Sequence, residues 1–146
     1  MGQYHKLINL TKKEYVNPHK IGLGAKHLEG IGFEGSMGDV MYLLSIAQGN
    51  ERRGGGDAEG HRYIGRWAGD KVVVVGDYYD QDNDNPKFKG LYDIDDGVHE
   101  NVHWHDISHG VRELLSKVMG VKFKENTYTT KELNGDEYQT THWNRI

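Results

Sequence analysis

The sequence predicts an α+β fold, in which a mostly antiparallel sheet has two main helices packed against it. Three observations support this prediction. Segments rich in valine, threonine and aromatic residues occur near the start, in the middle and at the end of the chain. Two other segments have the apolar spacing of amphipathic helices. Glycine is abundant between them, at 20 of 146 residues, about twice its usual frequency, which indicates many tight turns. A chain of this length is expected to form one compact domain over residues 1–146.

The predicted strands follow in chain order. Residues 4–10 and 14–16 are expected to pair as an N-terminal hairpin, and residues 17–35 are expected to be irregular. The four successive valines within residues 71–78 are too apolar for a strand with one wet face. We therefore expect this strand in the middle of the sheet, with both faces covered. A polar turn at 80–86 precedes a second expected strand at 88–94.

The first helix is expected to begin at Ser36, because Ser36 and Asp39 have the spacing of a capping box, and to end before Gly49. Its apolar residues lie three and four positions apart, which predicts one buried stripe. The second helix is expected over residues 107–119, capped by Asp106 and ended by Gly120. The Thr- and Tyr-rich tail predicts two or three terminal strands.

Composition limits the classes of partner. A formal net charge of −4 argues against binding to extended nucleic acid, which requires a basic face. The longest aliphatic run is four valines, far short of the roughly 20 residues of a membrane span. The chain has no cysteine, so a thiolate metal site and a cysteine nucleophile are excluded. We expect a soluble, cytoplasmic protein with no membrane partner. The composition is compatible with a local basic pocket for a small anionic ligand.

The segment RRGGGD is the first candidate site. Consecutive glycines let backbone N–H groups converge on an anion, and arginine side chains form paired hydrogen bonds with phosphate. However, this segment follows a helix and precedes a strand, the reverse of the usual phosphate loops. A solvated, glycine-rich turn is the alternative. The candidate anion-contacting residues are Arg52, Arg53, Gly54, Gly55, Gly56 and Asp57.

Polar and aromatic residues at the two ends of the valine strand extend this candidate site. Trp67 and Tyr78 are expected to pack against the ring of a ligand, and Asp70 and Asp77 to accept hydrogen bonds from its hydroxyl or amino groups. The alternative is a buried Trp67 with aspartates in ordinary turns.

The histidine-rich segment HENVHWHDISH is the second candidate. In an extended segment His103 and His105 share a face, and His109 is expected to return from the first turn of the following helix. Two or three imidazoles together with Asp106 or Glu100 suit zinc or a redox-active divalent metal. The alternative for Asp106 is a helix cap. No residue pair is placed clearly enough to be named catalytic, so whether the protein is an enzyme stays open.

Asp80, Asp82 and Asp84 have the spacing that begins a calcium loop, but Leu91 stands where the loop requires glutamate. We therefore interpret them as a solvated acidic turn.

Several segments together resemble a family of short bacterial and phage proteins. These segments are MGQYHKLINLTKKEY at the start, GNERRGGGD, IGRWAGDKVVVVGDYYD and GLYD. Members of that family begin with MGQY-like sequences and carry a glycine-rich loop ahead of a W-A-G-D strand. The resemblance covers the first two thirds of the chain and transfers no catalytic residue. It implies a host-facing role, such as binding a nucleotide-type defence signal.

Three hypotheses follow. The leading one is a protein that binds a small ligand, such as a nucleotide or another phosphate-bearing metabolite, and so sequesters it. The second is a metal-dependent hydrolase, such as a phosphodiesterase, that uses the histidine-rich segment. The third is an inhibitor that binds a host protein through exposed aromatic and acidic surface. The oligomeric state stays open.

Overall fold

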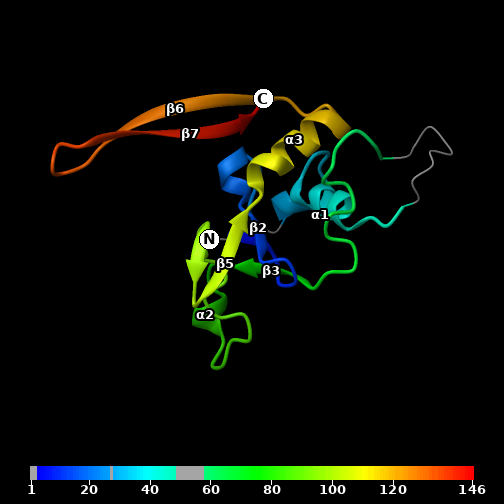
Figure 1. Ribbon diagram of the computed structural model, residues 1–146, viewed down its shortest axis with the longest axis horizontal. Helices are drawn as coiled ribbons and strands as arrows, with labels where there is room; N and C mark the ends of the chain where they lie inside the picture. The colour runs from blue at the N-terminus through cyan, green and yellow to red at the C-terminus, as the bar shows by residue number, and fades with distance from the viewer. Residues whose placement is uncertain (1–2, 27, 49–57) are drawn as a thin grey trace.

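The structure is a computed structural model that describes residues 3–26, 28–48 and 58–146. The predicted α+β class is confirmed (Figure 1). In chain order the elements are β1 (His5–Asn9), β2 (Glu14–Val16), the 3-10 helices η1 (Pro18–Ile21) and η2 (Leu28–Gly30), α1 (Met37–Ser45), β3 (Val72–Gly76), α2 (Tyr79–Asp82), β4 (Gly97–His99), β5 (Val102–Asp106), α3 (Ser108–Met119), β6 (Phe123–Lys131) and β7 (Glu137–Arg145).

Five strands form the central sheet in the order β3-β1-β2-β5-β4, and β6 and β7 form a separate two-stranded sheet. Neighbouring strands are antiparallel except β2 and β5, which are parallel. The sheet is therefore mixed, although mostly antiparallel as predicted.

The N-terminal hairpin of β1 and β2 is confirmed. Leu7 is paired with Val16 and Asn9 with Glu14. The buried Asn9 closes the turn, because its side-chain oxygen accepts a hydrogen bond from the Lys12 backbone at 2.8 Å. This contact satisfies a polar group that burial would otherwise leave unpaired.

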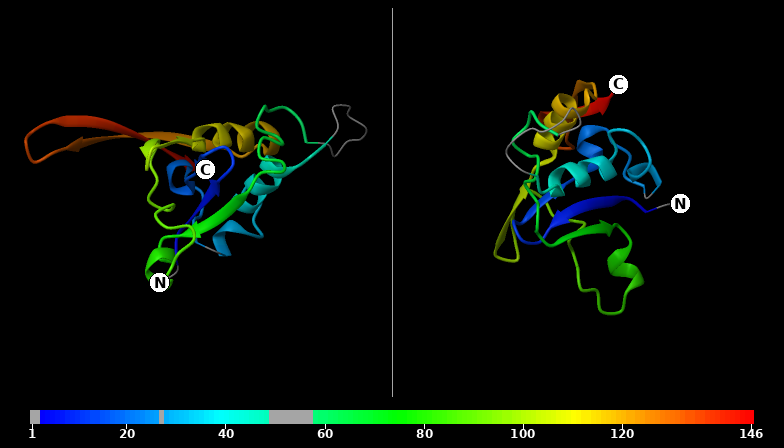
Figure 2. Two further views of the ribbon diagram at one scale, coloured as in Figure 1. Left: turned by 60° about the horizontal axis from the view of Figure 1, so that its bottom comes forward. Right: turned by 90° about the vertical axis from the view of Figure 1, so that its right-hand side faces the viewer.

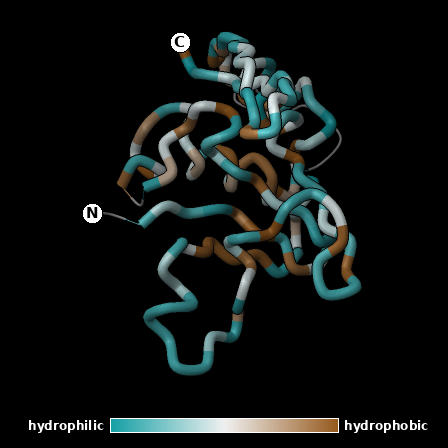
Figure 3. Tube along the Cα trace, turned by 90° about the vertical axis from the view of Figure 1, so that its left-hand side faces the viewer, coloured by the Kyte–Doolittle hydropathy of each residue, from teal (hydrophilic) through white to brown (hydrophobic). Residues whose placement is uncertain are grey.

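Each face of the central sheet has its own apolar core. One face is covered by α1 and α3 (Figure 2), and its core includes Leu7, Val16 and Leu44. On the other face, Ile8, Tyr15 and Trp104 pack against the segment that follows β3. When the chain is coloured by hydropathy, the apolar stretches lie mainly in the body of the molecule. The segment around α2 is largely hydrophilic (Figure 3).

The predicted central position of the valine strand is wrong. β3 is an edge strand that pairs only with β1. Val75 is buried in the second core, but Val74 faces the side of α1 and is 53% exposed. The valine run does contact both cores, through Val72 on one face and Val75 on the other. Its apolar character therefore reflects contact with both layers and does not require a strand on each side.

The strand predicted at residues 88–94 is also wrong, since this segment is a series of turns. Gly90 has a φ of +74°, which favours glycine, and its N–H donates to the Asp80 carboxylate at 2.8 Å. Phe88 and Leu91 pack against the second core from this loop, and Ile94 is buried in it. Apolar side chains that suggest a strand here cover a sheet face without joining the sheet.

Both predicted helices are present. α1 begins after Ser36, but Ser36 makes no side-chain cap, and Asp39 accepts from the Gly35 N–H instead, at 2.5 Å. α3 ends at Gly120, whose φ of +71° is the expected left-handed cap. The residue at its N-cap position is Ile107, while Asp106 accepts from the Ser108 N–H in the first turn.

Asp106 also receives the ammonium group of Lys20, which ties η1 to the start of α3. Burial alone would raise the pKa of Asp106, but hydrogen bonds from Lys20 and Ser108 hold it below its ordinary value. None of the helices in the part of the chain described by the structure is long and apolar enough to cross a membrane.

Of the two or three terminal strands that the sequence predicts, the described residues form two, β6 and β7, each nine residues long. They pair as a hairpin that projects from the body as an arm (Figure 1). Most of its side chains are exposed. Its base contacts η1 at Gly22, where a Cβ atom would lie 2.6 Å from the Asn144 Cα. Gly22 also has a φ of +67°, so glycine is required here both for the turn and for the close approach of β7.

A buried carboxylate joins the sheet to the loop before β3. Glu14 of β2 is 4% exposed and accepts hydrogen bonds from Arg66 Nε at 3.0 and 3.1 Å. Arg66 Nη2 forms a further contact with Glu14 Oε2, and Trp67 Nε1 donates to Oε1 at 2.9 Å. A buried charge is costly unless it is paired and hydrogen-bonded. Here Arg66 supplies the opposite charge to the Glu14 carboxylate, and both Arg66 and Trp67 donate hydrogen bonds to it.

We predict that Arg66→Ala lowers the free energy of unfolding by about 2 kcal/mol, because it leaves the Glu14 carboxylate buried without its cation. Urea denaturation followed by circular dichroism measures the change. Arg62→Ala is the matched control, since Arg62 is 70% exposed and lies 3.9 Å from Glu113. Its effect is expected to stay below about 0.5 kcal/mol. Equal effects of the two substitutions would contradict this account of the Glu14 cluster.

Candidate functional site

The glycine-rich candidate site predicted from the sequence lies outside the described residues. This applies to Arg52, Arg53 and Asp57, and to the glycines at 54–56. The anion-contacting role of this segment therefore stays a prediction.

Trp67 does not form a ligand-stacking surface. Its side chain is fully buried in the core beneath α1 and α3, and its indole N–H is bound to Glu14. The predicted stacking role is corrected: the ring is a core element that also completes the hydrogen bonding of a buried carboxylate.

The predicted polar contacts at the ends of β3 do not converge. Asp70 precedes the strand and Asp77 follows it, so they stand on the order of 20 Å apart along an extended chain. Asp70 accepts from the Asn9 amide at 2.9 Å and from Lys12. Asp77 accepts from the Tyr4 backbone at 3.1 Å. Tyr78 is half-buried at the start of α2, where its carbonyl accepts from Gln81 and Asp82. The two aspartates thus fix the ends of the β1–β3 pair.

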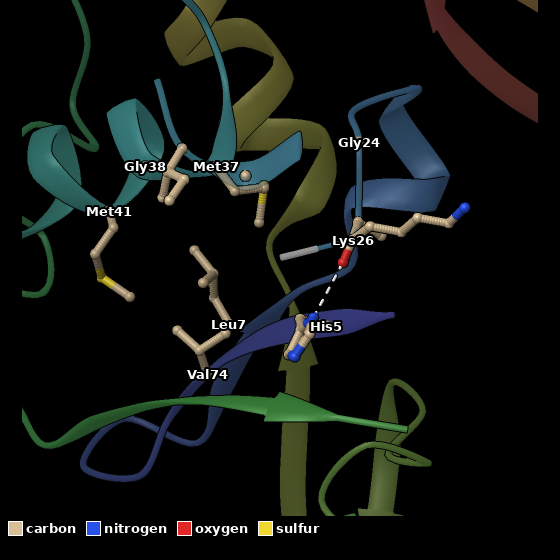
Figure 4. Close-up of a pocket in the computed structure, with 11 residues that line it drawn as sticks. His5, Leu7, Gly24, Lys26, Met37, Gly38, Met41 and Val74 are labelled. Atoms are coloured by element: carbon tan, nitrogen blue, oxygen red, sulfur yellow. Dashed lines mark hydrogen bonds between the residues drawn. The ribbon is translucent and has the colours of Figure 1, made fainter. Parts of the chain in front are cut away.

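A pocket of about 440 Å³ lies instead between α1 and the β1–β3 edge of the sheet (Figure 4). We call it the α1–β3 pocket. Its lining residues come from β1, β3, α1 and the irregular segment between β2 and α1, and most of them are apolar. They are His5, Leu7, Gly24, Ala25, Lys26, Gly30, Ile31, Met37, Gly38, Met41 and Val74.

The pocket follows from the way α1 crosses the sheet. Leu7 and Val74 are paired across β1 and β3, and both project toward the helix. Met37 and Met41, one helical turn apart, project down from α1 toward them (Figure 4). Gly38 brings the helix close to η2, since a Cβ atom there would lie 2.9 Å from the Gly30 carbonyl oxygen. The helix therefore forms one wall of the pocket. The opposite wall is formed by β1 and by β3, which is the edge strand of the sheet.

The polar lining lies on one side of the pocket, where the segment of Ala25 and Lys26 crosses β1. The His5 backbone donates to the Ala25 carbonyl at 2.8 Å, and His5 Nδ1 lies 3.3 Å from the same oxygen. Figure 4 shows the Lys26 side chain directed away from the cavity. The interior therefore presents methyl, methylene and thioether groups, with an imidazole at one end.

The histidine-rich segment forms a second, separate cluster at the opposite edge of the sheet. His103 and His105 of β5 share an exposed face as predicted, and their rings stack with centroids 4.3 Å apart. Their third neighbour is Asp96, just before β4. His109 lies exposed on the first turn of α3 and is not part of this group, so the predicted third ligand is corrected.

No family model, curated protein or solved structure matches the chain. The geometry of the two sites is therefore the only basis for assigning a function.

Sequence reasoning missed the α1–β3 pocket and the proximity of Asp96 to His103 and His105. The spacing of Met37 and Met41 predicts the buried stripe of a helix, and nothing in that spacing distinguishes a cavity wall from a filled core. Asp96 precedes His103 by seven residues, and only the tight β4–β5 hairpin brings it alongside β5. The strand-forming sequence on both sides of residues 100 and 101 could have predicted this hairpin, and the hairpin register would have placed Asp96 beside His105.

We predict that Asp70 supports stability, and that this support disappears in acid. The hydrogen bonds from Lys12 and Asn9 lower the pKa of Asp70 below its ordinary value. A carboxyl group whose pKa is lower in the folded state stabilises the fold above its unfolded pKa of about 3.9. This stabilisation is lost as the pH falls through the folded pKa.

The measurement compares the melting temperatures of the wild type and Asp70→Asn from pH 7 down to pH 2.5. The wild type is expected to melt higher at pH 7, and the difference is expected to vanish toward the acid end. A difference that is independent of pH would show that the charge of Asp70 plays no part.

Proposed function

We propose that the protein binds a small, mainly apolar ligand in the α1–β3 pocket. The observation that carries the proposal is the cavity itself, whose lining is mostly apolar. Met37, Met41 and the exposed Val74 of the edge strand β3 line this cavity but do not fill it. Its volume, about 440 Å³, lies within the range of roughly 300–1,000 Å³ typical of small-molecule sites.

Exposed apolar groups around the pocket support this proposal. Val74 is 53% exposed although it belongs to an otherwise apolar strand, and Ile31 on the facing segment is 52% exposed. Leu28 and Phe33, in the same segment as Ile31, are also exposed. Contiguous exposed apolar surface is costly in water and commonly marks a binding site. An apolar molecule bound in the pocket removes the surface of Val74 and Ile31, which line it, from water.

The methionines suit a ligand of variable shape. Their side chains are unbranched and polarizable, so Met37 and Met41 can adapt to the outline of a guest. The imidazole of His5 stands at one end of the lining. The expected ligand therefore has an apolar body and a single polar end that lies toward β1.

This proposal revises the ligand class expected from the sequence. Among the described residues, the lining contains no arginine and no carboxylate, and the side chain of its one lysine, Lys26, is directed away from the cavity (Figure 4). The lining therefore offers little to a phosphate or a sugar. A nucleotide or other phosphate-bearing ligand would depend on residues 52–57, and that hypothesis stays a prediction. Both the apolar ligand proposed here and the phosphate-bearing ligand expected from the sequence imply a protein that sequesters a small molecule.

We predict that Val74→Arg weakens binding of the neutral fluorescent probe N-phenyl-1-naphthylamine by at least about tenfold. The substitution places a charged group at the wall of an apolar cavity, where its desolvation is costly. Fluorescence titration of the purified protein measures the dissociation constant. Circular dichroism confirms that the variant is folded.

The matched control is Val98→Arg. Val98 is also an exposed valine on an edge strand, 72% exposed on β4, but it lies at the far side of the sheet. Its probe affinity is expected to equal that of the wild type. Absence of saturable probe binding by the wild type, or the same loss in both variants, would refute the proposal.

A further inference from the structure

We infer that Asp96, His103 and His105 form a binding site for a zinc-class divalent metal ion at the β4–β5 edge of the sheet. One ligand atom from each of the three side chains lies within 4.8 Å of the other two. This site is independent of the α1–β3 pocket, which lies at the opposite edge, beside β3.

Alternation along β5 separates the two histidines from the core. Trp104, between them in sequence, points to the other face of the sheet and is buried in the second core. His103 and His105 are therefore held on one face by the pleat of the strand, with both rings exposed. Anchoring of Trp104 fixes the direction of both imidazoles.

The backbone beneath the histidines is fixed on both sides. β5 pairs with β2 through His105 and Glu14, and with β4 through His103 and Val98. The His105 N–H also donates to the Lys13 carbonyl at 2.9 Å. The two histidines thus stand on a regular strand, which positions metal ligands more precisely than a loop does.

A tight turn brings the third ligand into register. Glu100 and Asn101 both have positive φ, 50° and 64°, which gives the two-residue turn that matches the twist of a hairpin. Gly97 is paired with Trp104, so Asp96 lies next to His105 across the two strands. Gly97 itself has a φ of +134°, a conformation that side chains rarely adopt.

The three side chains are available to an ion. Among residues 3–26, 28–48 and 58–146, none of them makes a side-chain hydrogen bond or ion pair with another residue. Two imidazole nitrogens and one carboxylate oxygen are the donor set of borderline metals such as zinc, whereas magnesium and calcium prefer oxygen alone.

The geometry also indicates the kind of site. Tetrahedral zinc, with bonds of about 2.0–2.1 Å, sets its ligand atoms about 3.3 Å apart. The ligand atoms of Asp96, His103 and His105 reach this separation when the three exposed side chains rotate about their own bonds. Three protein ligands leave a coordination position for water, as in catalytic rather than structural zinc sites. Because the ligands are exposed and must be ordered on binding, we expect a dissociation constant in the micromolar range.

The test is calorimetric titration of the tag-free, full-length protein with zinc chloride, after treatment with a chelator. The wild type is expected to bind one ion, and magnesium and calcium are expected to give no signal. His103→Ala and His105→Ala are each expected to weaken zinc binding by about tenfold or more, and Asp96→Asn by several-fold. Circular dichroism checks the fold of each variant.

His109→Ala is the matched control, since it removes another exposed imidazole from the same stretch of sequence. Its zinc affinity is expected to equal that of the wild type. No saturable binding below about 100 μM zinc, an equal loss in His109→Ala and His103→Ala, or unchanged affinity in Asp96→Asn would each overturn the proposed ligand set. Probe binding by the α1–β3 pocket is expected to be the same in all four variants, so the two proposals fail separately.

Discussion

The buried Glu14 carboxylate is the constraint on which much of the architecture depends. It holds Arg66 and Trp67 against the centre of the sheet, while the same loop is hydrogen-bonded to the end of α1. The Gly65 N–H donates to the Leu43 carbonyl at 2.9 Å, and the Trp67 N–H donates to the Leu44 carbonyl at 2.7 Å. One ionic group in β2 thereby links the end of α1 to the loop that leads into β3.

Both candidate sites inherit their geometry from this centre. α1 and β3 are the walls of the α1–β3 pocket, so the loop that Glu14 anchors determines the space between them. On the other side, Glu14 is the register partner of His105 in the parallel pair of β2 and β5. The residues of β2 are buried, whereas exposed side chains such as Val74 and Val98 lie on the edge strands β3 and β4. The two proposed binding sites thus lie toward opposite edges of the sheet.

Local patterns in the sequence predict local structure well here. The N-terminal hairpin, the two main helices, the left-handed cap at Gly120 and the terminal strands all follow from spacing and turn residues. The edge position of β3 and the loop at 88–94 do not, because the same apolar side chains can cover a sheet face or join a sheet. The contact of Asp96 with His103 and His105, and that of Glu14 with Arg66, depend on strand register and on chain segments far apart in sequence. No single window of sequence contains that information.

The β6–β7 arm affects how the whole molecule moves through water. Its strands pair with each other over nine residues, and its base lies against the chain at Gly22, next to η1, and against Arg112 of α3 (Figure 1). A compact domain of this length has a radius of gyration of roughly 15 Å. A projecting ribbon places mass far from the centre and drags solvent along its length. The protein should therefore diffuse and sediment as a larger, more elongated particle than its 16.6 kDa would suggest.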